Sequence, residues 1–318
     1  MNYIIYRLTF PNGVHFGNKN LDESNYTFSA DTLFSALFKE SLKFSNETYS
    51  KGFYESVKNG DLIFSDGLPF MEDTYYILKP MLYIEKLENF KTRKAYKNLK
   101  YIPIDLLDDY LNGEFDILSE KDIFEEFGVS SSKAAVAIRG EEESKPYRIG
   151  IYNFDKQNGL YILVGYNKKT DIDYFYDILN SLSYSGLGGK RSSGLGRFTI
   201  EKVADLPNEF KERLNIKGNN FMTLSISLPD KEELESVLEF ARYKLVKRSG
   251  FVASTNYADE FQRKKDFYAF EAGSCFKKMF KGNIYDVSAY GNHPVYRYAK
   301  GFFLEVSKKW KFIKEPLH

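Results

Sequence analysis

Hydrophobic residues recur along the first 84 residues at two different spacings. β-Branched and aromatic runs such as NYIIYRLTF predict strands, whereas apolar residues three or four positions apart predict helices that bury one face. The pattern predicts strands at 2–10, 61–65 and 74–84, one helix that begins at Ser29 or Asp31, and a second helix from Glu47 to Lys58 that Gly60 ends.

From about residue 85 to residue 146 the apolar periodicity weakens and the charges separate. Residues 91–100 carry five basic side chains and no acid, residues 105–126 carry nine acids and one lysine, and residues 130–145 are small and polar. We interpret this stretch as an insertion that lies outside the core. Its opposite charges either neutralise each other or form a surface for a partner.

Periodic patterns return after the insertion. Two strands at 147–154 and 159–166, with turn residues between them, predict a hairpin. A helix at 171–182, a glycine-rich loop at 185–196 and the strand RFTIEKV follow. The order of elements reduces to β-α-β-β-α-β, which is the order of a ferredoxin-like or RRM-like unit.

A polar stretch with proline and glycine at 205–220 marks the best domain boundary. We therefore expect an N-terminal domain at 1–205, with the insertion at about 85–146 and the glycine loop at 185–197, and a C-terminal domain at 206–318. The second domain is expected to contain a strand FMTLSISL, a helix at 231–243, a strand kinked at Gly250, further strands at 267–272 and 301–306, and long loops at 255–266 and 273–300. The fold class is thus α+β, with two ferredoxin-like (RRM-like) domains.

Composition narrows the class of protein. The 318 residues contain 45 Lys and Arg against 44 Asp and Glu, so the net charge of +1 excludes a uniformly basic nucleic-acid-binding protein. The single cysteine, Cys275, excludes an internal disulfide and a cysteine-only metal site, and is typical of a reducing compartment. No apolar run approaches the roughly 20 residues of a membrane span. We expect a cytoplasmic protein with no membrane contact, cofactor or metal.

The glycine-rich loop is the strongest candidate for a binding site. It holds five glycines in eleven positions, with Lys190 and Arg191 among them and no acidic residue. Backbone amides in such a loop can approach an anion closely, because no Cβ intervenes. The spacing fits neither a Walker loop nor a dinucleotide-binding fingerprint. We expect phosphate contacts from Gly186, Gly188, Gly189, Lys190, Arg191, Ser192, Ser193 and Gly194.

The stretch from 273 to 298 interleaves basic and aromatic residues, a composition that suits stacking on unpaired bases and contact with phosphates. The alternative is a structured loop whose rings pack on the second domain. The candidate RNA contacts are Phe276, Lys277, Asn292, His293, Tyr296 and Arg297, with Arg248 and Ser249 as weaker candidates near Gly250.

His15 lies in a loop after the first strand. Metal-free RNA cleavage needs a general acid and a general base near a ribose 2′-hydroxyl, and His15 could be one of them. A lone histidine in an apolar loop is more often structural, and no local partner is evident. The carboxylates at 105–126 are read as a solvated helical face rather than as Mg²⁺ ligands.

The glycine loop, SGLGGKRSSGLGRF, resembles the loop that follows the second helix in RAMP-superfamily proteins of CRISPR systems. The segments YRLTFPNGVHFG, LKYIPIDLLDDYLNG and GNIYDVSAYGNHPVYRYAKGFFL are similar to a more specific family. That family is the fourth Csm protein, the type III-A Csm effector-complex subunit that holds the 5′ handle of the crRNA. The resemblance runs along nearly the whole chain.

The resemblance implies two RRM-like domains that bind crRNA without catalysis, with His15 among the RNA contacts. It implies contacts with the large polymerase-type Csm subunit and with a backbone RAMP subunit, and contact with target RNA only through the guide duplex. A thumb-like insertion that wedges into this duplex matches Ser130–Lys145, with Lys133 and Arg139 as its basic residues. Two alternatives stay open: a RAMP endoribonuclease that processes precursor crRNA with His15, and a scaffold without RNA contact.

Overall fold

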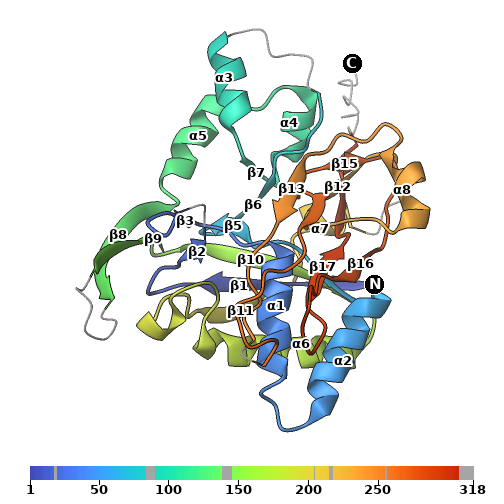
Figure 1. Ribbon diagram of the computed structural model, residues 1–318. Coiled ribbons are helices and arrows are strands. Elements are labelled where there is room, and N and C mark those ends of the chain that lie inside the picture. Colours follow the sequence, from blue (N-terminus) through green and yellow to red (C-terminus); the bar gives the residue numbers. More distant parts are fainter. Residues whose placement is uncertain are drawn as a thin grey trace, which may run out of the picture.

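The computed structural model describes residues 1–17, 20–83, 90–137, 145–203, 205–214, 218–254 and 256–307 (Figure 1). The helices are α1 (Ala30–Ser41), α2 (Glu47–Asn59), α3 (Phe90–Asn98), α4 (Leu107–Asn112), α5 (Ile117–Glu125), α6 (Lys169–Ser185), α7 (Asn208–Lys211) and α8 (Lys231–Leu238), with a 3-10 turn, η1 (Arg191–Ser193). The strands are β1 (Asn2–Thr9), β2 (Phe16–Gly17), β3 (Ser24–Asn25), β4 (Leu62–Phe64), β5 (Leu68–Met71), β6 (Thr74–Leu78), β7 (Tyr101–Pro103), β8 (Gly128–Ala137), β9 (Lys145–Phe154), β10 (Asn158–Tyr166), β11 (Thr199–Val203), β12 (Phe221–Thr223), β13 (Leu245–Arg248), β14 (Phe267–Phe270), β15 (Cys275–Phe276), β16 (Gly282–Asp286), β17 (Tyr296–Lys300) and β18 (Phe303–Glu305).

One antiparallel sheet organises the N-terminal half. Its strand order is β11-β1-β10-β5-β6-β7, and β4 also pairs with β10. β1 lies between β10 and β11, so that Ile5 stands opposite Leu163 on one side and Val203 on the other. Successive residues of a strand point to opposite faces of the sheet. Tyr6 and Ile5 accordingly belong to different buried clusters, and both faces of the sheet are covered.

Helices α1, α2 and α6 cover one face of this sheet (Figure 1). Leu33 and Phe34 of α1 and Phe175 of α6 are fully buried there, and burying each such side chain stabilises the fold by about 1.5–3 kcal/mol. The apolar spacing therefore predicted these helices correctly. The end of α2 is also confirmed, because Gly60 takes a φ of 81° at its C-cap.

The opposite face of the sheet is covered by the C-terminal half and by the insertion (Figure 1). Leu163 shares a buried cluster with Leu304 of β18 and Ile102 of β7, and β7 extends the sheet by pairing with β6. The expectation that the insertion lies outside the core is therefore wrong for residues 95–117. Their charged side chains are exposed or half-buried, while the apolar side chains between them pack against the sheet.

The predicted hairpin between 147–154 and 159–166 is wrong in its pairing. Both strands exist, but β9 pairs with β8, with Gly128 opposite Phe154. β10 lies in the centre of the sheet, between β1 and β5, and its first eight residues are buried. A strand buried on both faces needs buried neighbours on both sides, which the half-exposed β9 does not supply. β8 and β9 instead form a ribbon that points away from the body of the molecule (Figure 1).

The C-terminal half consists of smaller antiparallel sheets. β12 lies between β15 and β18, whereas β13 with β14 and β16 with β17 form two-stranded ribbons. The long loop expected at 273–300 is therefore wrong, since it contains β15, β16 and most of β17. The helix expected to reach residue 243 ends at Leu238, because Glu239 is extended and Arg242 bridges to Cys275. The strands expected at 267–272 and 301–306 are confirmed as β14 and β18.

The protein is thus a mixed α/β structure with antiparallel sheets. Among the helices that the structure describes, none combines the length and the apolar character needed to cross a lipid bilayer.

Candidate nucleic-acid interface

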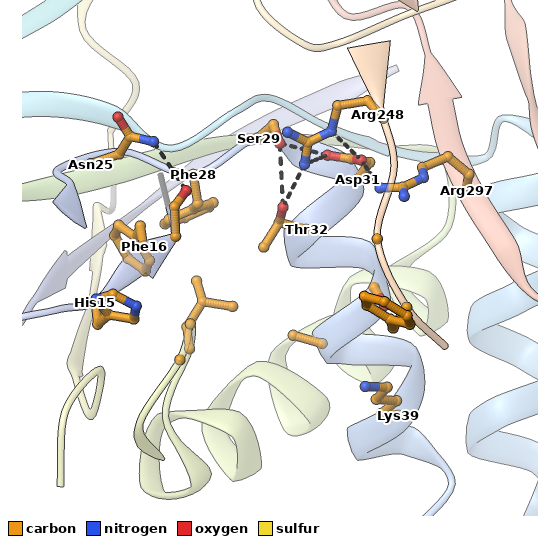
Figure 2. Close-up of a pocket in the computed structure, with 18 of the residues that line it drawn as sticks. His15, Phe16, Asn25, Phe28, Ser29, Asp31, Thr32, Lys39, Arg248 and Arg297 are labelled. Carbon is orange, nitrogen blue, oxygen red and sulfur yellow. Dashed lines mark hydrogen bonds and ion pairs between the residues drawn. The ribbon is translucent and has the colours of Figure 1, made fainter. Parts of the chain in front are cut away.

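A cleft of about 490 Å³ opens where the glycine loop, α1 and the C-terminal half meet. Figure 2 shows His15 and Phe16 on one side of this cleft and Arg248 and Arg297 on the other, with Lys39 farther along α1. The cleft lining includes nine residues that the sequence singled out: His15, Gly186, Gly188, Gly189, Arg191, Arg248, Ser249, Tyr296 and Arg297. Segments distant in sequence therefore form a single concave surface.

One wall of the cleft is the glycine loop, folded against the segment after β1. The amide of Gly189 donates to the carbonyl oxygen of His15 at 2.9 Å, and the amide of Gly186 donates to Leu182 at 2.7 Å. The amide of Gly194 donates to Arg191 at 2.9 Å. These three amides are already used, so the expectation that they clamp an anion is wrong. The loop acts as a wall that carries cations, and its left-handed glycines let it turn tightly.

The other wall is held by a buried ion cluster that joins the two halves of the chain. Asp31, in the first turn of α1, has a fully buried carboxylate. Arg248 donates to it twice, from Nε and from one terminal nitrogen, each at 2.9 Å, and Arg297 donates from the other side. Burial alone raises the pKa of Asp31, but the charges of Arg248 and Arg297 outweigh it and hold the pKa below its usual value.

Further hydrogen bonds fix the two halves to each other next to the cleft. Oδ1 of Asp66 accepts from the amide of Ala30 at 2.7 Å and from the amide of Ile226 at 3.0 Å. The hydroxyl of Tyr298 donates to the carbonyl oxygen of Phe64 at 3.1 Å and accepts from its amide at 3.0 Å. The shape of the cleft is therefore set by contacts between the N- and C-terminal halves.

Three cations of the cleft lack a counter-charge. None of the ion pairs formed by the described residues includes Lys39, Arg191 or Lys264. Burial lowers the pKa of Lys39, and the charge of Arg191 lowers it further. Burial and the charges of Arg297 and Lys39 lower the pKa of Lys264 to about 8. Cations that disfavour one another in this way form a site for an anion.

Several predicted contacts lie outside the cleft. Lys190 and Ser192 line a shallow neighbouring pocket, where Nζ of Lys190 lies 4.8 Å from the ring centroid of Tyr147. Ser193 ends the turn η1, and Gly194 caps it. Lys133 is exposed on β8, while Arg139 lies outside the described residues. Asn292 donates its amide to Tyr257, and His293 lines a second pocket beside the cleft.

Two predictions from the 273–298 stretch need correction. The ring of Phe276 is 2% exposed and packs against Phe270, Phe280 and Phe303, so stacking of a base on Phe276 is wrong. Arg297 is bound to Asp31 and buried, and its charge is therefore committed to the structure rather than to a ligand. Basic and aromatic residues alternate there because they alternate between the core and the surface, as in any half-buried strand.

His15 has a structural environment. Its ring is buried, and Nδ1 lies 2.7 Å from the carbonyl oxygen of Gly150, an arrangement that places the proton on Nδ1. A Cβ on Gly189 would lie 2.7 Å from Cδ2 of this ring, so His15 and the glycine loop are in close contact. Within the part of the chain that the structure describes, no group of three His, Cys, Asp or Glu side chains is placed to hold a metal ion.

Sequence reasoning missed three residues of the cleft, namely Lys39, Lys264 and Phe251. Asp31, Ser35 and Lys39 are spaced by four, and this spacing marks the polar face of α1 that lines the cleft. Lys264 belongs to the basic run RKKD in a segment that was expected to be a plain loop. Phe251 is 59% exposed beside these cations, which makes its ring accessible to a planar ligand.

Comparison with known proteins finds relatives in CRISPR systems. Residues 216–306 match the family model of the CRISPR Csm4 C-terminal domain. The "CRISPR system Cms protein Csm4" of Mycobacterium tuberculosis is 36% identical over 305 residues, which cover 96% of this chain and 98% of the relative. The protein of the same description from Streptococcus thermophilus is 33% identical over 317 residues, which cover 96% and 99%.

Solved structures share the fold. A chain in the crystal structure of the Csm3-Csm4 subcomplex of the type III-A CRISPR-Cas interference complex superposes with a TM-score of 0.65 at 20% identity, covering 95% of this chain and 98% of that chain. A chain in the Csm1-Csm4 cassette in complex with cA4 superposes with a TM-score of 0.59 at 17% identity, covering 98% and 100%. With relatives of more than 30% identity along 96% of its length, this chain belongs to the Csm4 family of type III-A (Csm) CRISPR systems.

Proposed function

We propose that this chain is a non-catalytic subunit of a Csm interference complex that holds the 5′ handle of the crRNA in the cleft of Figure 2. The observation that carries the proposal is the set of three cations, Lys39, Arg191 and Lys264, that no carboxylate among the described residues neutralises. Such a site attracts a phosphate, because bringing a negative charge there relieves repulsion among the cations.

The shape of the cleft favours single-stranded RNA. Side chains read RNA mainly where bases are unpaired, since the major groove of an A-form duplex is too narrow for them. Phe251 offers an exposed ring next to Arg248 and Lys264, so a base can stack there while its phosphate meets the amines. The cleft thus combines the two elements that a handle-binding site needs.

The partners that we propose are the large polymerase-type Csm subunit and a backbone RAMP subunit. The structural relatives support this, because they were solved as a Csm1-Csm4 cassette and as a Csm3-Csm4 subcomplex. Target RNA is proposed to reach this chain only through the guide duplex. The ribbon of β8 and β9 is proposed as the wedge, since it stands clear of the body and exposes Val129 and Val136 by 64% and 56%.

We further propose that the N-terminal half is a ferredoxin-like unit. The chain order β1, α1, β4, β10, α6, β11 supports it, and the strands lie side by side as β11-β1-β10-β4. The C-terminal half from about residue 206 is proposed as the second domain, although its strands form several small sheets rather than one.

The test replaces Lys39 and Lys264 together by alanine and measures guide retention over a series of salt concentrations. The matched control replaces Lys156 and Lys231, which are exposed and away from the cleft, so that both variants lose two charges. Loss of two phosphate contacts should flatten the slope of log K against log salt by about 1.4, from roughly 0.7 per contact on a single strand. A slope equal to that of the control would remove the cleft from guide binding.

A further inference from the structure

A second pocket, of about 660 Å³, opens beside the cleft and is lined mainly by apolar side chains. Phe34, Phe38 and Leu42 form one wall, because residues four apart share one side of a helix. Val252 and Val295 of the C-terminal half contribute to the other wall. The volume lies in the range of about 300–1,000 Å³ that is typical of ligand pockets.

Polar groups stand at the rim of this apolar pocket. Nδ1 of His293 lies 2.9 Å from the carbonyl oxygen of Pro294, so Nδ1 carries the proton, and the hydroxyl of Ser254 donates to Nε2 at 2.9 Å. The oxygen of Ser254 keeps its capacity to accept a hydrogen bond. The pocket therefore offers an apolar interior with hydrogen-bonding groups at one edge, which suits a flat ring with polar atoms on its perimeter.

The apolar pocket and the cleft share a boundary. Lys39, Lys264 and Tyr296 line both of them. The ring of Tyr296 is held in place by Tyr54, at 4.7 Å between centroids, and by Phe38, at 5.9 Å. Any molecule that enters the apolar pocket from the cleft passes the two lysine amines, neither of which is paired with a carboxylate of the described residues.

We propose that the apolar pocket receives one unpaired nucleobase of the guide RNA, flipped out of the strand, while the phosphate attached to its nucleoside lies between Lys39 and Lys264. This inference rests on the proposed function, because the guide must lie in the cleft for one of its bases to reach the pocket. Flipping a base costs least in single-stranded RNA, where no pairing is lost. Stacking and burial of the base then replace its contacts with its neighbours.

The charges favour a nucleotide over an apolar side chain from a partner protein. An inserted leucine or phenylalanine would fill the pocket but would leave Lys39 and Lys264 further desolvated without an anion, at a cost in free energy. A nucleotide supplies the apolar ring and the negative charge together, at adjacent positions. One base of the handle should therefore contribute far more to guide retention than its neighbours.

The test uses complexes reconstituted from the full-length chain, its partner subunits and synthetic guide RNAs that carry one abasic sugar at successive handle positions. With the unmodified chain, we expect one position at which loss of the base speeds guide dissociation about tenfold, the middle of the range for one stacked base. The variant Ala253→Trp places a large ring at the exposed edge of the pocket. It should release the intact guide about tenfold faster and show no further loss at that one abasic position.

The matched control is Ser236→Trp on the exposed surface of α8, which should behave as the unmodified chain does. If every abasic position has the same effect in Ala253→Trp as in the unmodified chain, the base pocket is refuted while the proposed function stands. If neutralising Lys39 and Lys264 leaves retention unchanged, the proposed function fails first. If Ala253→Trp instead prevents a partner subunit from joining while guide retention is normal, the occupant is a protein side chain and the inference is wrong.

Discussion

Replacing Asp31 by asparagine should destabilise the protein by about 3–5 kcal/mol, the usual loss when one member of a buried ion pair is removed. The structure supports the full range. The Asp31 side chain has no exposed surface, and that of Arg297 is only 9% exposed, so the variant leaves a buried guanidinium without its counter-charge. Arg248 is 28% exposed and can turn toward water, which keeps the loss below that of two stranded charges.

The assay is chemical unfolding of the full-length chain, followed by circular dichroism at several pH values. Because the folded pKa of Asp31 is depressed, its contribution to stability is present above the unfolded pKa of about 3.9 and is lost as the pH falls through the folded value. The difference between the unmodified chain and Asp31→Asn should therefore be constant from about pH 5 to pH 8 and shrink in more acidic solution.

The matched control is Glu47→Gln. Glu47 forms an ion pair with Lys51, but both side chains are more than three-quarters exposed, so no change in stability is expected. A loss of less than about 1 kcal/mol for Asp31→Asn, or a difference that does not shrink in acid, would show that the cluster is solvated and that the reasoning about the joined halves is mistaken.

Three further predictions concern the cleft. A bound phosphate favours the charged form of Lys264, whose pKa is about 8, so RNA affinity measured by fluorescence anisotropy should fall by up to about tenfold from pH 7 to pH 9, and Lys264→Arg should flatten this dependence. Gly196→Ala should lower the melting temperature far more than Gly194→Ala, because a Cβ on Gly196 would lie 2.0 Å from the carbonyl oxygen of Leu187, whereas Gly194 faces open space and only its φ of 84° opposes the change. Incubation of the purified protein with precursor crRNA should give no cleavage; cleavage that His15→Ala abolishes would make the chain a nuclease.

Local patterns predicted the local elements well. The strand at 2–10 and the helices that begin near Ser29 and Glu47 follow from apolar spacing alone, and Gly60 ends the second helix as its left-handed conformation requires. The pairing of β9 was not predictable in this way, because turn residues after it resemble those of a hairpin. Which strand becomes its neighbour depends on burial along β10, and that is a property of the whole sheet.

The candidate site was found only in part for a similar reason. The glycine loop announced itself by composition, and Arg248 by its place next to a glycine. Lys39 and Lys264 gain their meaning from being brought to one cleft, and no pattern in the sequence connects them. Arg297 was assigned to RNA because the sequence does not reveal that Asp31, 266 residues earlier, lies beside it.

The same separation along the chain governs when the cleft can exist. A ribosome makes Asp31 and Lys39 early, yet Arg297 emerges only when almost all of the polypeptide has been synthesised. Domains generally fold as units during synthesis, N-terminal regions first. A nascent N-terminal half therefore carries one wall of the groove without the other, and transcripts encountered during translation meet an unfinished binding surface. Loading of the guide is in this way postponed to the completed polypeptide.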